Sequence, residues 1–232
     1  MSGTQGWDRA RWLWWLALAG GISFMVAVVQ RLEGPPIWAW KTTGVAFLAL
    51  WAAANARGTH GWLIAAALGF GALGDYLIDA VGIMAGAAAF AIGHLIAITF
   101  YLRNRRGVLT SSQKLLIFSV APLALFITYQ IVHRAEPTDI IASMVYTGIV
   151  AIMAATAWAS RFSRYVTGIG AMLFLASDLV LFKSMTPRIG PIVEALPPLS
   201  WPQLLVWPLY FGGQALIAWG VVSTLSREAG DR

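Results

Sequence analysis

The chain has 232 residues, of which 59% are hydrophobic and 11% are charged, and its formal net charge is +6. A soluble domain carries about 25% charged residues, so this composition excludes a soluble globular protein and predicts an integral membrane protein. Cysteine is absent, which excludes disulfides and thiolate metal sites.

Eight apolar segments follow one another along the chain. About 20 residues cross a bilayer core of ~30 Å, so each segment is long enough to span a membrane. We therefore expect an all-α polytopic protein with one transmembrane domain over residues 1–232. The predicted spans are 12–30, 37–56, 61–79, 82–102, 114–132, 138–159, 164–183 and 203–224. The first is too long for the apolar core of a signal peptide and is predicted to be a retained anchor.

The segment between the last two spans contains five of the prolines, at 187, 191, 197, 198 and 202. Proline removes a backbone donor and breaks helices. This segment is therefore predicted to be an irregular loop that caps one end of the bundle.

The basic residues lie in short loops between the apolar runs, which favours membrane orientation over nucleic-acid binding. An orientation with both termini in the cytoplasm places most of them on that side: Arg9, Arg11, Arg57, Arg103, Arg105, Arg106, Lys114, Arg161, Arg164, Arg227 and Arg232. The other side keeps Arg31, Arg134, Lys183 and Arg188. This bias predicts cytoplasmic termini and is typical of a bacterial inner-membrane protein.

Two carboxylates interrupt predicted spans. Asp75 lies in the third span and Asp178 in the seventh. An ionisable side chain at this depth costs roughly 2.5–3.5 kcal/mol on insertion scales. Such residues usually face a polar cavity and serve chemistry or transport, so we expect an internal polar cavity inside the bundle.

Helix rise places several polar side chains at similar depth. Asp75 and Asp178 each lie about 14 residues, or ~21 Å, above the cytoplasmic end, and Lys41 lies about 22 Å above it. The same layer is expected to contain Tyr210, with Gln214 one turn deeper on the same face, His94 lower at about 12 Å, and Tyr146 between them. These residues are the candidate site.

Two close carboxyl groups with one nearby ammonium group favour a state in which the pair holds one proton. Such a pair contains a general acid and a general base. The alternative is a structural ion pair of the acids with Lys41, which leaves one carboxylate without a partner.

Each other candidate also has a structural interpretation. Lys41 is close enough to the outer end of its span to extend to the interface. His94 fits a core histidine that donates to a carbonyl, Tyr210 fits an interfacial aromatic belt, and Gln214 fits an interhelical hydrogen bond. Asp79 sits at a helix end, either solvated or lining the mouth of the cavity.

The sequence does not favour a metal or cofactor site. Its three histidines, His60, His94 and His133, are predicted in a cytoplasmic loop, inside the fourth span and at the outer end of the fifth. That separation excludes a three-histidine zinc centre. A site of His94 with the two acids is left open, although a depth difference of about 9 Å counts against it. The glycine-rich run 69–74 lacks the lysine of a phosphate-binding loop, and small residues beside both acids favour close helix packing.

The order and spacing of several blocks resemble the YhhN-type lysoplasmalogenase family of membrane proteins. These blocks are Lys41, GALGDYLI with Asp75, FAIGH with His94, GAMLFLASD with Asp178, and YFGGQ with Tyr210 and Gln214. The chain departs from the family where a tyrosine often follows the histidine by three residues, because Ala97 stands there.

The resemblance implies an eight-helix hydrolase that cleaves the vinyl ether of a lysoplasmalogen, or of a related lysolipid, without a cofactor. Asp75 and Asp178 would be catalytic, and Lys41, His94, Tyr146, Tyr210 and Gln214 would bind substrate or water. Its partners would be the lysophospholipid and membrane lipids. The alternatives are a proton-coupled transporter and a membrane protein that binds a lipid without turnover.

Overall fold

The computed structural model describes residues 10–185 and 201–230, and its long elements are eight α-helices. They are α1 (Arg11–Gln30), α2 (Pro35–Ala54), α3 (Gly58–Ala80), α4 (Ile83–Arg103), α5 (Ser111–Val132), α6 (Pro137–Ala159), α7 (Ile169–Met185) and α8 (Trp201–Gly230). A short π-helix, η1 (Arg164–Gly168), leads into α7.

The eight predicted spans are confirmed as helices, most of them to within about three residues. The largest difference is at the end of α8, which continues to Gly230 rather than stopping at 224. The prediction stopped where the apolar run ends, but the following STLSREA contains good helix formers and no stop signal before the glycine. The predicted loop at 187–202 lies outside the described residues, except for its last two, which begin α8.

Seven of the described helices are long and apolar enough to cross a membrane, which indicates an integral membrane protein. The exception is α2, whose first half contains two prolines, Lys41 and two threonines. It nevertheless packs between α1 and α3. The outer surface is apolar as well: α5 exposes 78% of Phe118 and also presents Leu115 and Phe126, as expected for a helix that faces lipid.

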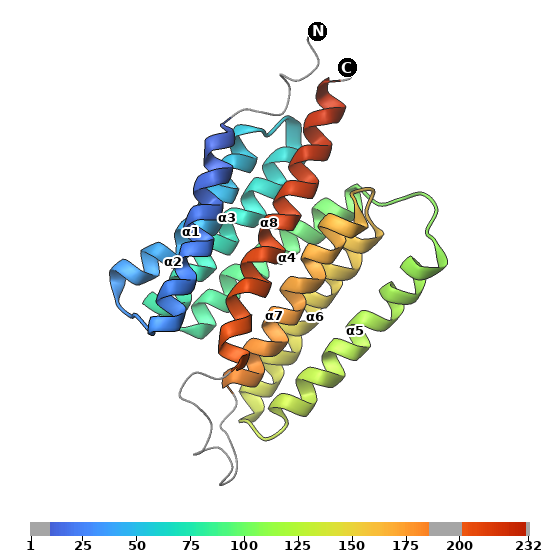
Figure 1. Cartoon of the computed structure of the whole chain (residues 1–232). Helices are drawn as coiled ribbons and strands as arrows, with labels where there is room; N and C mark the ends of the chain where they lie inside the picture. The colour runs from blue at the N-terminus through green and yellow to red at the C-terminus, as the bar shows by residue number, and fades with distance from the viewer. Residues whose placement is uncertain (1–9, 186–200, 231–232) are drawn as a thin grey trace.

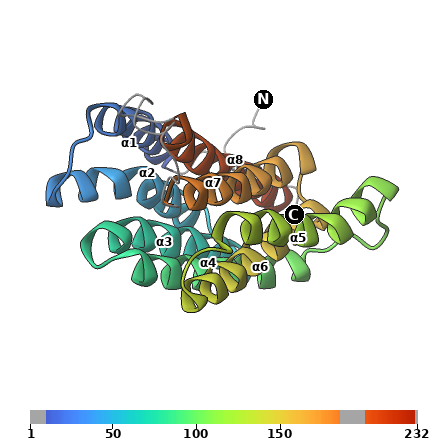
Figure 2. The same cartoon turned by 90° about the horizontal axis from the view of Figure 1, so that it is seen from below.

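The helices form two rows (Figure 2). One row contains α3, α4 and α6, and the other contains α1, α8 and α7. At one side of the rows α2 packs against α1, α3 and α8, and at the other side α5 packs against α6 and α7. The space between the rows is therefore lined by α3, α4 and α6 on one side and by α7 and α8 on the other.

Glycines allow the helices to approach closely beside the acids. A Cβ atom at Gly170 of α7 would lie 2.7 Å from the carbonyl oxygen of Gly213 in α8, and the reverse distance is also 2.7 Å. A Cβ at Gly74 would lie 2.7 Å from the Phe90 ring of α4. The predicted packing role is confirmed at these positions, whereas Gly69 has nothing within 4 Å.

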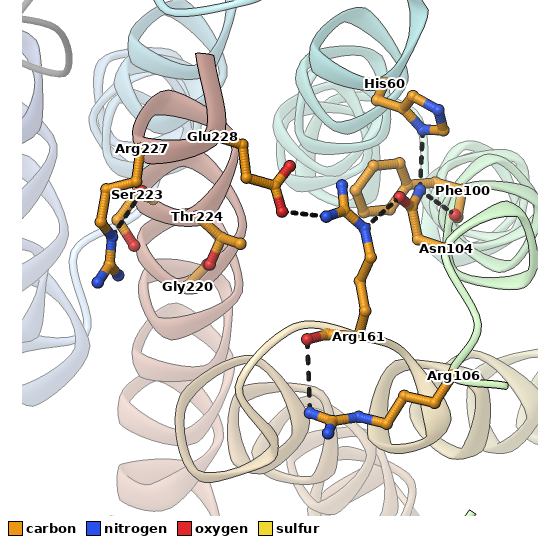
Figure 3. A network of polar contacts seen from close by, with 10 residues as sticks. All are labelled: His60, Phe100, Asn104, Arg106, Arg161, Gly220, Ser223, Thr224, Arg227 and Glu228. Carbon is orange, nitrogen blue, oxygen red and sulfur yellow. Dashed lines mark hydrogen bonds and ion pairs between the residues drawn. The ribbon is translucent and has the colours of Figure 1, made fainter. Parts of the chain in front are cut away.

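A polar network joins four elements at the end of the bundle where α8 finishes (Figure 3). The Asn104 amide nitrogen lies 2.8 Å from His60 Nδ1, and its Oδ1 accepts a hydrogen bond of 2.8 Å from Arg161 Nε. Arg161 also pairs with Glu228 of α8. We call this side of the molecule the network end.

His60 was predicted in a loop but lies in the first turn of α3. Helix formation begins at Gly58, as soon as the positive φ of 66° at that residue has reversed the chain. The network brings together the start of α3, the end of α4, the segment after α6 and the end of α8. This is the alternation of helix direction that the predicted spans require (Figure 1).

Candidate functional site

The first acid lies between the two rows. Asp75 of α3 is only 2% exposed, and its Oδ2 accepts a hydrogen bond of 2.8 Å from the Tyr210 hydroxyl of α8. Gln214 lies one turn further along α8, next to Tyr210. It reaches α3 where Gly71 leaves room, since a Cβ there would lie 2.9 Å from Gln214 Nε2. These contacts agree with the predicted depths, with Tyr210 at the level of Asp75 and Gln214 one turn deeper.

The second acid faces the opposite row. Asp178 of α7 is 9% exposed, and the Tyr146 hydroxyl of α6 is close enough to interact with its carboxyl group electrostatically. Tyr146 is also close enough to Asp75 and Tyr210 to interact with both electrostatically. The two acids and the two tyrosines thus form one polar layer between the rows.

The carboxyl groups keep separate partners. In the parts of the chain that the structure describes, no hydrogen bond joins Asp75 directly to Asp178, because each faces a tyrosine instead. The Oδ2 atom of Asp178 is buried and has no hydrogen-bond partner. An unsatisfied buried oxygen of this kind calls for an explanation, and it leaves one carboxyl oxygen available to a ligand.

His94 lies on the network side of this layer, as its predicted depth requires. Its ring packs edge-on against Phe174 of α7, with centroids 4.7 Å apart, and against Tyr146 at 6.1 Å. His94 Nε2 is buried without a partner, as is the Tyr101 hydroxyl. Both residues line a void of about 20 Å³ together with Gln214 and Ala97, which is enough room for about one water molecule.

Lys41 forms its direct ion pair outside the acid layer, although its charge lies within electrostatic reach of Asp75. Its Nζ pairs at 2.9 Å with Oδ2 of Asp79, and the two side chains are 17% and 28% exposed. Within the described residues, the direct ion pair of Lys41 with Asp75 and Asp178, the alternative drawn from the sequence, is not formed. Asp75 and Asp79 lie on one face of α3. The direction of the lysine side chain therefore decides which acid it pairs with, and here it pairs with the outer one.

Lys41 and Asp79 line a cavity of about 790 Å³ at the end of the bundle where α2 and α8 begin. We call this the cavity end. Asp79 was expected either in solvent or at the mouth of an internal cavity. It lines this cavity at the end of the bundle, and neither buried acid is among the lining residues. Trp207 lines the same cavity and packs against Tyr210, with ring centroids 5.5 Å apart, so the cavity approaches the acid layer.

Several contributors were not predicted. Phe90 and Phe174 enclose Tyr210, with ring centroids 5.8 and 5.2 Å from it. Tyr101 adds an unpartnered hydroxyl to the void. Phe90 and Phe174 fall inside the sequence blocks FAIGH and GAMLFLASD, and this position in the blocks was the signal that could have assigned them to the site. Apolar type alone does not separate them from ordinary core residues.

Within residues 10–185 and 201–230, no group of three or more His, Asp or Glu side chains is placed to hold a metal ion. The site consists instead of carboxyl, phenol, imidazole and amide groups between the rows. These groups can exchange protons and orient water.

Comparison with known proteins finds one family model that matches the chain. The model of the YhhN family matches residues 37–221, a range that includes Lys41, both buried acids and all the other candidate site residues. No curated protein and no solved structure matches the chain. Because the family model covers well over half of the chain, the chain belongs to the YhhN family.

Proposed function

We propose that this protein is a membrane-embedded hydrolase that cleaves the vinyl ether bond of a lysoplasmalogen or a related lysolipid. The products are a fatty aldehyde and glycerophospho-ethanolamine or glycerophospho-choline. Membership of the YhhN family supports the reaction class. The observation that carries the proposal is the polar layer, in which two buried carboxyl groups from opposite rows each face a tyrosine hydroxyl.

The chemistry requires an acid and a carboxylate side by side. A carboxylic acid transfers its proton to the vinyl carbon remote from the ether oxygen, which leaves an oxocarbenium ion. Water adds to the carbon that carries the oxygen, and a carboxylate takes a proton from that water. The carboxylate also stabilises the cation in a site of low dielectric. The hemiacetal then breaks its carbon–oxygen bond to release the glycerol oxygen as an alcohol and the fatty chain as an aldehyde.

Asp75 and Asp178 supply these two roles as a pair. Both acids lie within electrostatic reach of Tyr146, and the donor and carboxylate roles are not assigned between them. Tyr210 and Tyr146 orient the two groups, and the unpartnered Oδ2 of Asp178 is the oxygen available to substrate.

The void beside Gln214 suits the water that the reaction consumes. Its polar wall includes His94 Nε2 and the Tyr101 hydroxyl, both buried and unpartnered. A buried water typically makes about three hydrogen bonds, and these atoms with the Gln214 amide offer that number. His94 and Gln214 then act as water-positioning groups, and the lysine at the cavity end meets the substrate phosphate.

Isotope labelling tests the reaction. Purified wild-type protein in detergent is incubated with a vinyl-ether lysolipid in D₂O, and the aldehyde is reduced at once and analysed by mass spectrometry. Protonation at carbon predicts one deuterium at carbon 2 of the aldehyde. In H₂¹⁸O the released glycerol hydroxyl is predicted to keep its original oxygen.

Two outcomes contradict the proposal. One is an aldehyde without deuterium, or ¹⁸O in the glycerol product, because either requires a different bond cleavage. The other is no aldehyde at all combined with lipid or proton flux in proteoliposomes, which supports a transporter.

A further inference from the structure

The cavity end contains a charged cluster of which the proposed function uses only the lysine. Lys41 of α2, Asp79 of α3 and Glu33 of the α1–α2 connection all line the 790 Å³ cavity. Lys41 and Asp79 are paired at 2.9 Å. The cluster therefore presents one cation and two carboxylates to the same space, and its formal charge is negative.

The cavity that contains this cluster is lined, on three helices, by residues about one helical turn outward from the polar layer. Asp79 follows Asp75 by four residues on α3, Leu181 follows Asp178 by three on α7, and Trp207 precedes Tyr210 by three on α8. Three or four residues of helix correspond to about 4.5–6 Å. The cavity floor thus lies one turn above the acids.

That offset matches the geometry of a lysolipid. Six covalent bonds separate the oxygen-bearing vinyl carbon, to which water adds, from the phosphorus atom, a reach of about 7 Å when each bond spans roughly 1.5 Å in a zigzag. A substrate whose vinyl ether meets the acids therefore carries its phosphate to the level of Lys41 and its headgroup amine into the cavity.

The charges of the cluster select among headgroups. A phosphate alone gains Lys41 but meets the carboxylates of Asp79 and Glu33, and like charges at short range disfavour binding. A headgroup with both a phosphate and an ammonium group pairs with all three residues. When Lys41 binds the phosphate, the ammonium group of such a headgroup replaces the lysine as the partner of Asp79. A purely anionic headgroup leaves Asp79 without a partner.

We propose, resting on the function proposed above, that Lys41, Asp79 and Glu33 form the subsite for a zwitterionic headgroup. Lys41 binds the phosphate, and Asp79 with Glu33 binds the amine. Binding exchanges the Lys41–Asp79 pair for two pairs with the ligand. Asp79 is therefore a specificity determinant rather than a structural partner of the lysine.

Binding of uncleavable ligands tests this without turnover. Two lysolipids are used that share one saturated 1-O-alkyl chain, one with a phosphoethanolamine headgroup and one with a phosphoglycerol headgroup. Affinities are measured by calorimetry in detergent. The wild-type protein is expected to bind the ethanolamine lipid about three- to tenfold more tightly, a preference typical of partly exposed charge pairs.

The Asp79→Asn variant gives the sharpest result. It is expected to bind the ethanolamine lipid more weakly and the glycerol lipid more tightly than wild type, because removing Asp79 frees Lys41 for phosphate. Glu33→Gln is expected to weaken only the ethanolamine lipid, and Lys41→Gln to weaken both. The control is Asp139→Asn, an exposed acid in the first turn of α6, which is expected to change neither affinity.

The outcomes separate this inference from the proposed function. If wild type prefers neither headgroup, or Asp79→Asn weakens both lipids equally, the subsite is refuted, even where vinyl ethers are still cleaved. If the crossing pattern is found but no vinyl ether is cleaved, the subsite holds for a lipid-binding protein and the hydrolase proposal fails.

Discussion

At the scale of single residues, the candidate site depends on two tyrosines that lie beside the buried acids. Tyr210 donates to Asp75 across the rows, and Tyr146 faces Asp178 while remaining within electrostatic reach of Asp75. A buried carboxyl group without partners is costly, so these phenols both stabilise the acids and fix their directions. The direction of the carboxyl oxygens is what the proposed chemistry needs.

The first prediction concerns Tyr210. Tyr210→Phe removes the hydroxyl that donates to Asp75 and keeps the ring among Phe90 and Phe174. A hydrogen bond to a charged group is worth about 1.5–3 kcal/mol, so kcat for aldehyde release is expected to fall about tenfold to a hundredfold. Steady-state kinetics with a vinyl-ether lysolipid measure this change.

The matched control is Tyr76→Phe. Tyr76 follows Asp75 directly on α3, but its side chain is exposed. We expect wild-type kcat for this variant. Equal losses in the two variants, or no loss in Tyr210→Phe, would contradict the role of the phenol.

The sequence predicted the depth of the site residues along their helices accurately, but it predicted their interaction partners less well. Helix rise alone placed Tyr210 at the level of Asp75 with Gln214 one turn deeper, and in the structure Tyr210 donates to Asp75 while Gln214 lies beside Gly71. It did not distinguish Asp75 from Asp79 as the partner of Lys41, since both lie on one face of α3. Long flexible side chains reach over more than a turn, so the pairing depends on side-chain direction, which periodicity does not give.

At the scale of helices, α7 and α8 form the closest crossing beside the site. Gly170 and Gly213 let the two backbones touch. A Cβ atom added at either glycine would lie 2.7 Å from the carbonyl oxygen of the other. Asp178 lies eight residues beyond Gly170, and Tyr210 lies three residues before Gly213. This crossing therefore sets the separation of Asp178 from the Asp75–Tyr210 pair.

The second prediction compares neighbouring glycines of α8. Gly213→Ala forces a Cβ against the backbone of α7, so we expect a destabilisation of about 1–3 kcal/mol and a lower Tm. Gly212 has nothing within 4 Å, and Gly212→Ala is expected to keep or raise Tm because alanine is the better helix former. Thermal unfolding in detergent measures both. A Gly213→Ala variant as stable as Gly212→Ala would refute the close crossing.

Helix positions were predictable because hydropathy and span length determine them directly. The small residues next to the acids also indicated close packing. The partner of each small face was not predictable, because a lipid-facing and a protein-facing apolar surface have the same composition. The continuation of α8 to Gly230 was missed for a related reason, since hydropathy reports where the membrane ends and not where the helix ends.

At the scale of the whole molecule, the two ends differ. The cavity end is hollow and charged, whereas large buried side chains fill the bundle between the polar layer and the network end, among them Phe100, Phe162, Leu68 and Ile64. The Asn104 network then ties the helices together beyond them. In the described residues, the large cavity therefore lies on one side of the polar layer only.

The third prediction concerns orientation in the membrane. The chain has no cysteine, so single-cysteine variants report sidedness cleanly. Gly107→Cys lies at the network end and Glu136→Cys at the cavity end, and both positions are exposed. The basic-residue bias predicts that a membrane-impermeant maleimide labels only Glu136→Cys in intact bacterial cells and labels both after lysis. Labelling of Gly107→Cys alone in intact cells would reverse the orientation.

The most direct measurement compares aldehyde release from a vinyl-ether lysolipid by wild type, Asp75→Asn, Asp178→Asn and the control Asp139→Asn. Loss of a general acid or base typically costs 10²–10⁴-fold. We therefore expect a loss of about that size in the first two variants, with wild-type Tm and elution volume, and an unchanged rate in the control. Folded Asp75→Asn or Asp178→Asn protein that releases aldehyde at the wild-type rate would contradict the account.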